Sequence, residues 1–590
     1  MKRIAIKVFA IIGGVATLFV IVLAAVAIAL IYKEDEEVPQ LTVLEIDLGR
    51  NLPEHVPADP IAEILLPDAV TVRDLVEGLH RAALDERVVA LLARVGNSGM
   101  GLARLQEVRD AVHAFGESGK PAVAYAETFG EFGPGNGAYY LATAFDEIYL
   151  QPSGVVGLTG LIAETPFIRE MLEKLGVVPR LDHRAEYKNA KNFYTERQYT
   201  PEHKEATQAV MDSQFDQLVR GIADRRGLSP EGVRSLFDRG PFLSKDALEA
   251  GLVDGLAYRD EVYERVKEQV DPGAKYLTLR KYLKRLEDSH EQARTVALIY
   301  GVGGVTRGKS DFDPGSGTTT MGSDTITRAF RNAVRDHEVE AILFRVDSPG
   351  GSYVASDAIW RETVRAREAG KPVVISMGDV AGSGGYFVAM AADRIVAQPG
   401  TITGSIGVVG GKMLTAGLWE KTGISWDEVH TSAHSTMWTG TKDYSEEEWT
   451  LFQEWLDTVY EDFTDKVAEG RSLPKERVLD IAKGRIWTGE DARKLGLVDA
   501  LGGYRTALKL IREAAQLAPD AELRLKVFPR AKSTWEYLLE HGIVRSSESA
   551  VASAYVHTMR KLQPVFTLAQ RLGIIPSPGV LTMPEIAPFR

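Results

Sequence analysis

One serine of this chain stands in a setting that suits a nucleophile. Ser383 lies in the Gly-Ser-Gly-Gly run at 382–385, between an apolar stretch at 372–375 that predicts a buried strand and a segment from Tyr386 that predicts a helix. A serine at a strand-to-helix turn projects its hydroxyl, and the first free N–H groups of the helix face an incoming oxygen. This layout predicts a nucleophile beside an oxyanion hole. A glycine turn that packs a helix closely on a sheet is the structural alternative.

Two glycines are candidate donors to an oxyanion. Gly384 follows the serine directly, and Gly351 lies in the Asp-Ser-Pro-Gly-Gly-Ser run at 347–352, after an apolar stretch that predicts a strand. Successive glycines let bare backbone N–H groups approach a ligand closely. We therefore expect Gly351 and Gly384 to donate, with Gly350 as the next choice. An ordinary strand-to-helix turn is the alternative for the 347–352 run.

The chain repeats itself at a spacing of about 250 residues. Four pairs of segments match in order: 42–46 with 295–299, 119–121 with 370–372, 135–140 with 382–387, and 251–254 with 496–499. Their offsets of 253, 251, 247 and 245 drift slowly, as a few loop insertions and deletions would cause. The sequence therefore predicts a tandem duplication.

The two copies differ at matched positions in a reciprocal way. The pairs at an offset of 247 are Ser383 with Asn136, Ser405 with Leu158, and Lys188 with Ser435. A serine hydroxyl needs a general base, and a lysine serves when burial lowers its pKa. One site built from both copies would combine Ser383 with Lys188, and Ser405 would hold the amine in place. A solvated surface position is the alternative for Lys188.

Elements of alternating type must position these residues. In the second copy, 339–346 predicts a strand and 353–369 a helix; a strand around Val373, a helix from Tyr386 and a strand at 394–397 follow. Strands separated by helices predict βαβ units and a largely parallel sheet, hence an α/β fold. Residues 280–294 predict a connecting helix, and 306–323 predict a mobile loop because they are rich in Gly, Ser, Thr and Asp.

The first 33 residues predict a membrane anchor. Three cations within residues 1–7 precede 25 uncharged residues, Val8 to Tyr32. This length spans the hydrocarbon core of a bilayer, and the cations place the N-terminus in the cytoplasm. A cleaved signal peptide is the alternative, because Ala-Val-Ala at 25–27 fits a cleavage site. We expect four parts: the anchor at 1–33, repeats at 34–290 and 291–520, and an extension at 521–590.

Composition narrows the function further. The 590 residues carry a net charge of −13, which disfavours a nucleic-acid partner. The chain has no cysteine, which excludes disulfides, thiolate nucleophiles and cysteine metal sites. It also lacks the His-Glu-x-x-His motif of metal sites, and no metal or cofactor is expected.

The motifs together resemble the long form of bacterial signal peptide peptidase A. They are Asp-Ser-Pro-Gly-Gly-Ser at 347–352, Ala-Gly-Ser-Gly-Gly-Tyr at 381–386, Thr-Gly-Ser-Ile-Gly at 403–407 and Tyr-Lys-Asn-Ala at 187–190. The resemblance covers roughly residues 40–510. It implies tandem Clp-protease-like or crotonase-like domains with a serine–lysine dyad formed by both halves. Gly382 departs from the alanine commoner in that family, and residues after 520 have no confident match.

Roles and surroundings follow from the same resemblance. It implies Ser383 as nucleophile, Lys188 as general base, Ser405 as the partner of the lysine, and Gly351 and Gly384 as oxyanion donors. It further implies a homotetrameric dome on the outer face of the bacterial cytoplasmic membrane. The expected substrates are apolar signal peptides already released by the processing peptidase.

Three other functions fit parts of the sequence. A general quality-control protease of the envelope has the same chemistry, and the sequence does not separate it from signal peptide disposal. A crotonase-type acyl-CoA enzyme also uses paired N–H groups, but acyl-CoA is cytoplasmic and the reciprocal serine and lysine would be unexplained. A silent membrane scaffold would have lost its catalytic groups, as the first copy has, whereas the second copy keeps them.

Overall fold

A computed structural model describes most of the chain. The described residues are 37–57, 69–286, 293–313, 318–530 and 581–582. The expected anchor at 1–33 lies outside these ranges. Within them, no helix combines the length and apolarity that crossing a bilayer requires.

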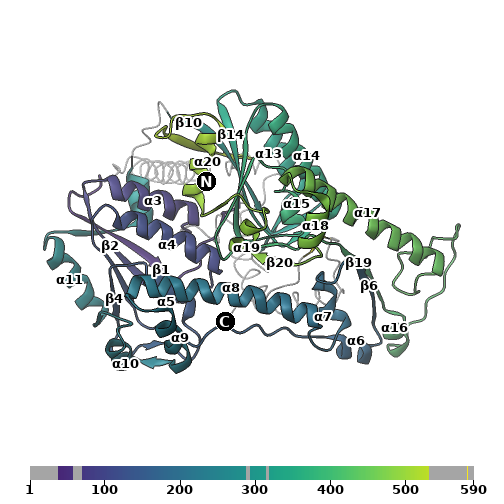
Figure 1. The fold of residues 1–590 in the computed structure, drawn as a ribbon, viewed down its shortest axis with the longest axis horizontal. Coiled ribbons are helices and arrows are strands. Elements are labelled where there is room, and N and C mark those ends of the chain that lie inside the picture. The colour runs from purple at the N-terminus through teal and green to yellow at the C-terminus, as the bar shows by residue number, and fades with distance from the viewer. Residues whose placement is uncertain (1–36, 58–68, 287–292, 314–317, 531–580, 583–590) are drawn as a thin grey trace, which may run out of the picture.

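Two parallel sheets with the same strand order form the two halves of the molecule (Figure 1). The first sheet runs β9 (Lys275–Thr278), β1 (Thr42–Leu48), β2 (Val88–Val95), β3 (Ala122–Ala126), β4 (Glu147–Leu150), β8 (Gly255–Leu256). The second runs β22 (Leu523–Phe528), β10 (Arg294–Val302), β14 (Val339–Ser348), β16 (Val373–Gly382), β17 (Arg394–Ala397), β21 (Ala500–Leu501). The matching order shows the expected duplication in three dimensions, and the parallel pairing agrees with the predicted βαβ units.

In each half, a small second ladder lies beyond the end of the fourth strand in this order, β3 or β16. In the second half, β16 pairs with β17 through its first residues and with β18 (Ile402–Gly404) through its last, and β18 pairs with β20 (Ile486–Thr488). In the first half, the corresponding pair is β5 (Val155–Val156) with β7 (Phe242–Leu243). The last residues of β16 therefore leave the main sheet and join the small ladder of β18 and β20.

Helices cover the sheets and join the two halves through one core. The strands read as nearly continuous apolar runs because helices bury both faces of a parallel sheet. Helix α4 of the first half and α20 of the second both pack against β16, and one apolar cluster includes residues of both halves. The helices of the two bodies are α3 (Val72–Leu84), α4 (Leu102–Gly116), α5 (Asn136–Ala142), α9 (Pro230–Arg239), α10 (Ser244–Glu249), α11 (Arg259–Val270), α12 (Leu279–Arg285), α13 (Ser323–Arg335), α14 (Tyr353–Glu368), α15 (Gly384–Phe387), α18 (Lys475–Ile481), α19 (Gly489–Lys494) and α20 (Tyr504–Ala514).

Each half also sends out an arm. The first arm contains α6 (Arg169–Leu175), β6 (Val178–His183), η1 (Asn189–Lys191), α7 (Asn192–Thr195) and α8 (Pro201–Arg226). It reaches across the second half, and α8 runs along the molecule beneath both sheets (Figure 1). The second arm contains β19 (Val409–Leu414), α16 (Ala416–Lys421) and α17 (Glu446–Arg471), and it projects at the right of the figure. Strands β6 and β19 pair in antiparallel fashion and tie the arms together.

Three expected elements differ from the structure. The segment 306–323, expected to be a mobile loop, contains β12 (Phe312–Asp313) and β13 (Thr318–Gly322), because β13 pairs with β11 (Gly304–Thr306) on one side and with β12 on the other. The helix expected from Tyr386 ends at Phe387, since only six residues separate it from β17. The connecting helix expected over 280–294 is α12, which ends at Arg285; β10 already begins at Arg294.

Candidate active site

The lysine of the first half meets both serines of the second half. Lys188 Nζ lies 2.7 Å from Ser383 Oγ, 3.0 Å from Ser405 Oγ and 2.9 Å from the Ser405 carbonyl oxygen. All three residues are fully buried. The structure therefore brings together three residues that sequence reasoning selected from two distant parts of the chain.

The turn between β16 and α15 positions Ser383. The backbone of Ser383 has φ +53° and ψ −115°, in a region that residues with a side chain seldom adopt. Its N–H donates to the Gly404 carbonyl at 2.8 Å, which anchors the turn to the end of β18. Backbone strain of this kind persists only where the surroundings over-determine it, and it concentrates at functional sites. A strained serine between a strand and a helix is also the arrangement that presents a nucleophile.

The first arm positions Lys188. The residue follows β6 and sits at the start of η1, and the neighbouring Tyr187 N–H donates to the Lys483 carbonyl at 2.9 Å. Two glycines of the second half make room for the lysine. A Cβ added at Gly484 would lie 2.5 Å from Lys188 N, and one at Gly407 would lie 3.2 Å from Lys188 Cδ.

Sequence reasoning missed these two glycines as parts of the site. Gly407 closes the Thr-Gly-Ser-Ile-Gly motif, so its position in that motif was an available signal. Gly484 adopts φ +73° and lies 296 residues from the lysine it contacts, and no local pattern announces such a distant contact.

The surroundings of Lys188 favour the neutral form of its amine. Burial alone holds the pKa of Lys188 well below its usual value. Its hydrogen-bond partners among the described residues are two hydroxyl groups and a carbonyl, and none carries a negative charge that would favour the ammonium form. A neutral amine 2.7 Å from a hydroxyl has the protonation state and the distance that a general base requires.

Two glycine backbones adjoin the serine. A Cβ added at Gly384 would lie 3.0 Å from Gly351 N and 2.8 Å from Ser356 Oγ, and one at Gly351 would lie 2.1 Å from the Val305 carbonyl oxygen. Both positions therefore require glycine because the backbones approach so closely. Gly350, the next choice from the sequence, donates its N–H to Ser348 Oγ at 3.2 Å.

A buried ionic cluster fastens the two halves beneath the site. The Arg345 guanidinium on β14 contacts Glu54 at 2.8 and 2.9 Å and Glu107 at 2.7 Å, and it also donates to Ser376 Oγ at 2.8 Å. Burial by itself would lower the pKa of Arg345, but the two carboxylates outweigh it and raise that pKa. Removing one partner from such a cluster would leave a buried charge unpaired, so the cluster fixes how the halves meet.

A second set of carboxylates lies next to this cluster. Asp379 accepts hydrogen bonds from the N–H groups of Gly101 and Arg104 at 3.1 and 3.0 Å, and the Arg104 guanidinium pairs with it. Asp347 accepts from Val380 N at 3.0 Å and opens the run that contains Gly351. Burial, together with the charges of Asp379 and Glu54, raises the pKa of Asp347 to about 7. Among the residues that the structure describes, no set of three or more histidine, aspartate or glutamate side chains could hold a metal ion.

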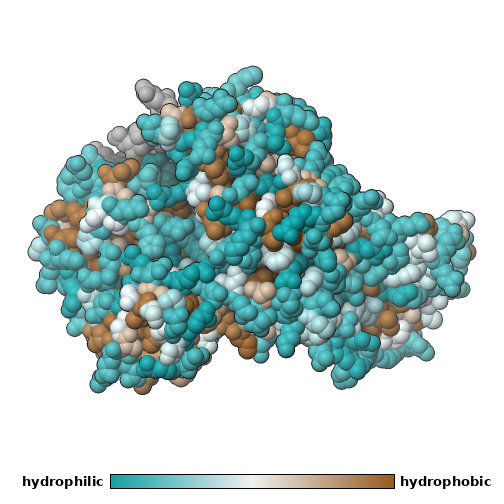
Figure 2. All heavy atoms as spheres, viewed as in Figure 1, coloured by the Kyte–Doolittle hydropathy of each residue, from teal (hydrophilic) through white to brown (hydrophobic). Residues whose placement is uncertain are grey.

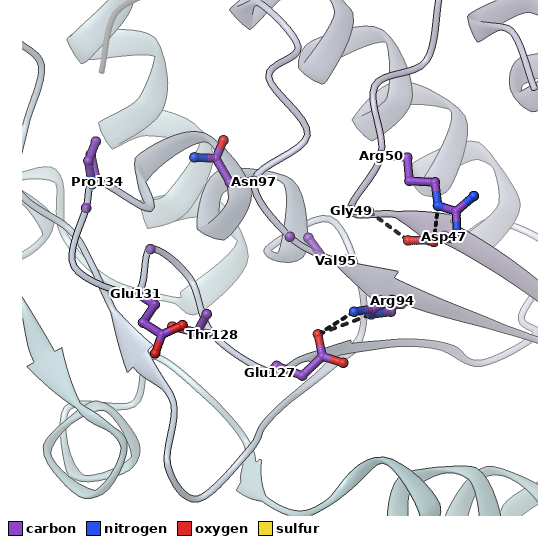
Figure 3. Close-up of a pocket in the computed structure, with 13 residues that line it drawn as sticks. Asp47, Gly49, Arg50, Arg94, Val95, Asn97, Glu127, Thr128, Glu131 and Pro134 are labelled. Carbon is purple, nitrogen blue, oxygen red and sulfur yellow. Dashed lines mark hydrogen bonds and ion pairs between the residues drawn. The ribbon is translucent and has the colours of Figure 1, made fainter. Parts of the chain in front are cut away.

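The first half carries a different structure at the matched turn. Asn136 begins α5, donates its amide to the Gly160 carbonyl at 2.7 Å and accepts from Thr159 N at 3.0 Å. A pocket of about 470 Å³ lies nearby, at the carboxyl ends of β1, β2 and β3 (Figure 3). Charged side chains line it, with Arg94 paired to Glu127 and Arg50 to Asp47, each at 3.0 Å. No lysine is among the described residues that line this pocket.

Comparisons with known proteins identify the family of this chain. The model of peptidase family S49 matches the chain twice, over residues 114–272 and 365–518. The chain is 30% identical over 478 residues to the chloroplastic serine protease SPPA of Arabidopsis thaliana, covering 79% of this chain and 69% of the relative. It is 32% identical over 456 residues to Protease 4 of Salmonella typhi, covering 75% and 72%. A putative signal peptide peptidase SppA of Enterococcus faecium is 32% identical over 191 residues, covering 32% and 56%.

Proposed function

The chain belongs to peptidase family S49 and is a serine peptidase, and on that premise we propose that Ser383 and Lys188 form its catalytic dyad. The observation that carries the proposal is the 2.7 Å separation of Lys188 Nζ and Ser383 Oγ in a fully buried site. The two residues are 195 positions apart and come from different halves. Burial of the amine without a carboxylate partner supports its role as the base.

The dyad cleaves a peptide bond in two stages. Ser383 Oγ attacks the carbonyl carbon while Lys188 Nζ takes the hydroxyl proton, and a tetrahedral oxyanion forms. The N–H groups of Gly351 and Gly384 donate to that oxyanion. Lys188 returns the proton to the leaving amine, which departs and leaves an acyl group on Ser383. Lys188 then takes a proton from water, whose oxygen attacks the acyl group. Lys188 gives this proton to Ser383 Oγ as the acyl–oxygen bond breaks, which releases the second product and restores the dyad.

Ser405 orients the base in this proposal. Its hydroxyl and carbonyl oxygens, at 3.0 and 2.9 Å, hold the amine in a fixed position. An oriented amine directs its lone pair at the Ser383 proton, which a freely rotating lysine would do only part of the time.

The substrates we propose are apolar peptides, and released signal peptides above all. The name of the Enterococcus faecium relative and the motifs of the dyad support this substrate class. The uncharged stretch Val8 to Tyr32 supports an anchor in the bacterial cytoplasmic membrane, with the catalytic body on its outer face. Such a location would hold the enzyme where cleaved signal peptides collect. General quality control of envelope proteins is the alternative substrate range.

We propose further that copies of this chain assemble into a ring, with four copies as the expected number. The first arm lies on the second half of its own chain and supplies Lys188. The second arm is its counterpart, and it projects from the body (Figure 1). Trp426 and Trp438 on that arm are 62% and 64% exposed, and apolar patches mark its surface in Figure 2. Docking of the second arm on the first half of the next copy would repeat the contact seen within one chain.

The boundaries of the two repeats follow from the strands of the two sheets. We propose repeats at 34–290 and 291–520, with β22 after residue 520 completing the edge of the second sheet through its pairing with β10. The segment 521–590 then contributes β22 to the second sheet.

Hydrolysis of a fluorogenic apolar peptide tests the proposed dyad. The parent chain should cleave the peptide, and Ser383→Ala and Lys188→Ala should not, while both variants keep the parent's circular dichroism and melting temperature. A folded Lys188→Ala chain with parental activity would exclude Lys188 as the base. Parallel assays with synthetic signal peptides and with an unfolded protein then separate signal peptide disposal from general quality control.

A further inference from the structure

One of the two glycines proposed to bind the oxyanion, Gly351, belongs to a small separate sheet. Gly350–Gly351 form β15, which lies between two other strands in the order β12-β13-β11-β15-β23. On one side, β15 pairs in parallel with β11 through Val305 and Gly351. On the other side, it pairs in antiparallel fashion with β23 (Leu581–Thr582). The register sets Thr582 opposite Gly350 and Leu581 opposite Gly351.

The strand β23 therefore lies where an extended substrate is expected. A strand has two hydrogen-bonding edges, and β11 already occupies one edge of β15. A peptide whose carbonyl reaches the N–H groups beside Ser383 must approach along the remaining edge. Peptides commonly bind in this way, by adding a strand to an open sheet edge. That remaining edge is the one that Leu581–Thr582 occupy.

We propose that the C-terminal segment of the chain restrains its own peptidase by occupying the substrate-binding edge of β15. This inference rests on the proposed function of Ser383 and Gly351. The occupant is the same chain's segment at Leu581–Thr582, which must leave the edge before a peptide substrate binds. The 50 residues at 531–580 extend to at most about 165 Å, so the tether from the body places no limit on this contact within one chain.

The sequence around Leu581 suits a short, replaceable strand. The run Val-Leu-Thr-Met at 580–583 has the apolar and β-branched character of a strand and of the proposed substrates. Pro578 and Pro584 flank it. A proline lacks the N–H that a ladder needs, and it favours an extended conformation in the residue before it. The flanking prolines therefore confine the pairing to a few residues and keep it weak enough for a substrate to displace.

Competition of this kind has a defined kinetic signature. A tethered occupant reduces the fraction of molecules whose edge is open. The apparent KM rises by the reciprocal of that fraction, and kcat is unchanged. Weakening the pairing should therefore lower KM alone. Damage to the catalytic groups would lower kcat instead.

Amide hydrogen exchange on the full chain tests the contact without requiring activity. The background is Ser383→Ala, so that no cleavage of the tail occurs during the measurement. The double substitution Leu581→Pro/Thr582→Pro removes two N–H groups from β23, whereas Thr582→Val keeps its N–H and its β-branched shape and serves as the matched control. We expect the amides at 348–352 to exchange at least about threefold faster in the proline variant and at the parent rate in the valine variant.

Kinetics on the active chain provide the second test. With Ser383 intact, the proline variant should show an apparent KM about three- to tenfold lower than the parent, with the same kcat. A synthetic peptide with the sequence of residues 578–585 should then inhibit the proline variant competitively. The same peptide with proline in place of Leu581 and Thr582 should not.

Each other outcome overturns the inference. Equal exchange at 348–352 in all three chains would exclude the contact, and so would an unchanged KM. A difference that grows with protein concentration would assign the tail to a second copy of the chain. Removal of the tail by the parent enzyme, seen by mass spectrometry, would make it a substrate instead of a restraint. If the exchange difference holds while the parent hydrolyses no peptide, the contact stands and the proposed peptidase site fails.

Discussion

The two halves share one fold but differ at the same turn. In the second half, the β16–α15 turn presents Ser383, whose hydroxyl meets a lysine of the other half. In the first half, the β3–α5 turn presents Asn136, whose amide binds the backbone of Thr159 and Gly160. The same strand–turn–helix geometry thus holds a reactive group in one place and a local hydrogen-bond clamp in the other. The two halves have the same strand order, so strand order does not distinguish the turns. The difference is Lys188, which the first half supplies to the turn of the second half.

The surroundings of the two turns differ as strongly as the residues. The second turn receives Lys188 from the first arm, and this lysine is fully buried, which lowers its pKa well below the usual value. The first turn adjoins an accessible pocket lined by paired arginines and carboxylates. A neutral amine needs a site without water, so under the proposed mechanism the arm that carries Lys188 also provides the burial that this base requires.

The largest expected effect separates the two turns directly. Ser383→Ala should lower kcat/KM for an apolar peptide by about 10⁴-fold or more, because the nucleophile is lost. The matched change Asn136→Ala should leave kcat/KM within about twofold, since the first turn performs no chemistry. Steady-state hydrolysis of the two variants measures both values. Comparable losses in the two variants would break the contrast between the halves.

The next largest effect concerns the residue that the first half supplies. Lys188→Met keeps the length of the side chain and should lower kcat by about 10²- to 10⁴-fold, the usual contribution of a general base. Adding Ser435→Lys at the matched position of the second arm should not restore activity, because that arm projects away from the Ser383 turn. Single-turnover acylation of Ser383 is the measurement. Recovery in the double variant would show that either arm can serve the site.

The lowered pKa of Lys188 gives this contrast a pH dependence. Because the folded pKa lies below the unfolded value, the unfolded chain binds more protons between those two values. The contribution of this group to the free energy of unfolding therefore falls as the pH falls through that window, by up to about 1.4 kcal/mol per pH unit. Urea unfolding of the parent and of Lys188→Met should show this slope in the parent only. The acid limb of kcat/KM should follow the same protonation, and Asn136→Ala should leave both profiles unchanged.

A moderate effect is expected at the ionic contact between the halves. Glu54→Gln weakens a bidentate pair with the fully buried Arg345 and should lower the free energy of unfolding by about 3 kcal/mol. It should also lower kcat, because the halves lose part of what fixes their relative position. The triple variant Glu54→Gln/Glu107→Gln/Arg345→Met, which leaves no unpaired charge, should recover most of the stability. Urea denaturation and peptide hydrolysis check both points.

The smallest expected effect is that a serine at the first turn restores no peptide hydrolysis. Adding Asn136→Ser to the Ser383→Ala chain places a hydroxyl at the first turn but brings no lysine to it. Hydrolysis should therefore stay at the level of Ser383→Ala. An increase beyond assay error would show that the first half retains a working base, and the contrast drawn above would then rest on residue 136 alone.

Much of this architecture is legible in the sequence because it depends on local patterns. The parallel strand order follows from apolar runs alternating with helical stretches, and the duplication follows from four ordered matches. The proximity of Lys188 and Ser383 was expected from their reciprocal loss, although their catalytic roles stay predictions. The ionic contact of Arg345 with Glu54 was not predicted, because 291 residues separate the partners and neither lies in a motif. The strands within 306–323 were not predicted, because turn-forming residues gave no sign of the pairing of β13 with β11 and β12.

The crossing of the first arm has a consequence for the newly made protein. Ribosomes complete residue 188 long before residue 383, and the pieces that enclose the lysine, at 405 and 484, come later still. A nascent chain therefore carries an incomplete peptidase until nearly all of the second half has been synthesised and packed. With Ser383 and Lys188 as the proposed dyad, hydrolysis becomes available only after the second half has folded around the lysine.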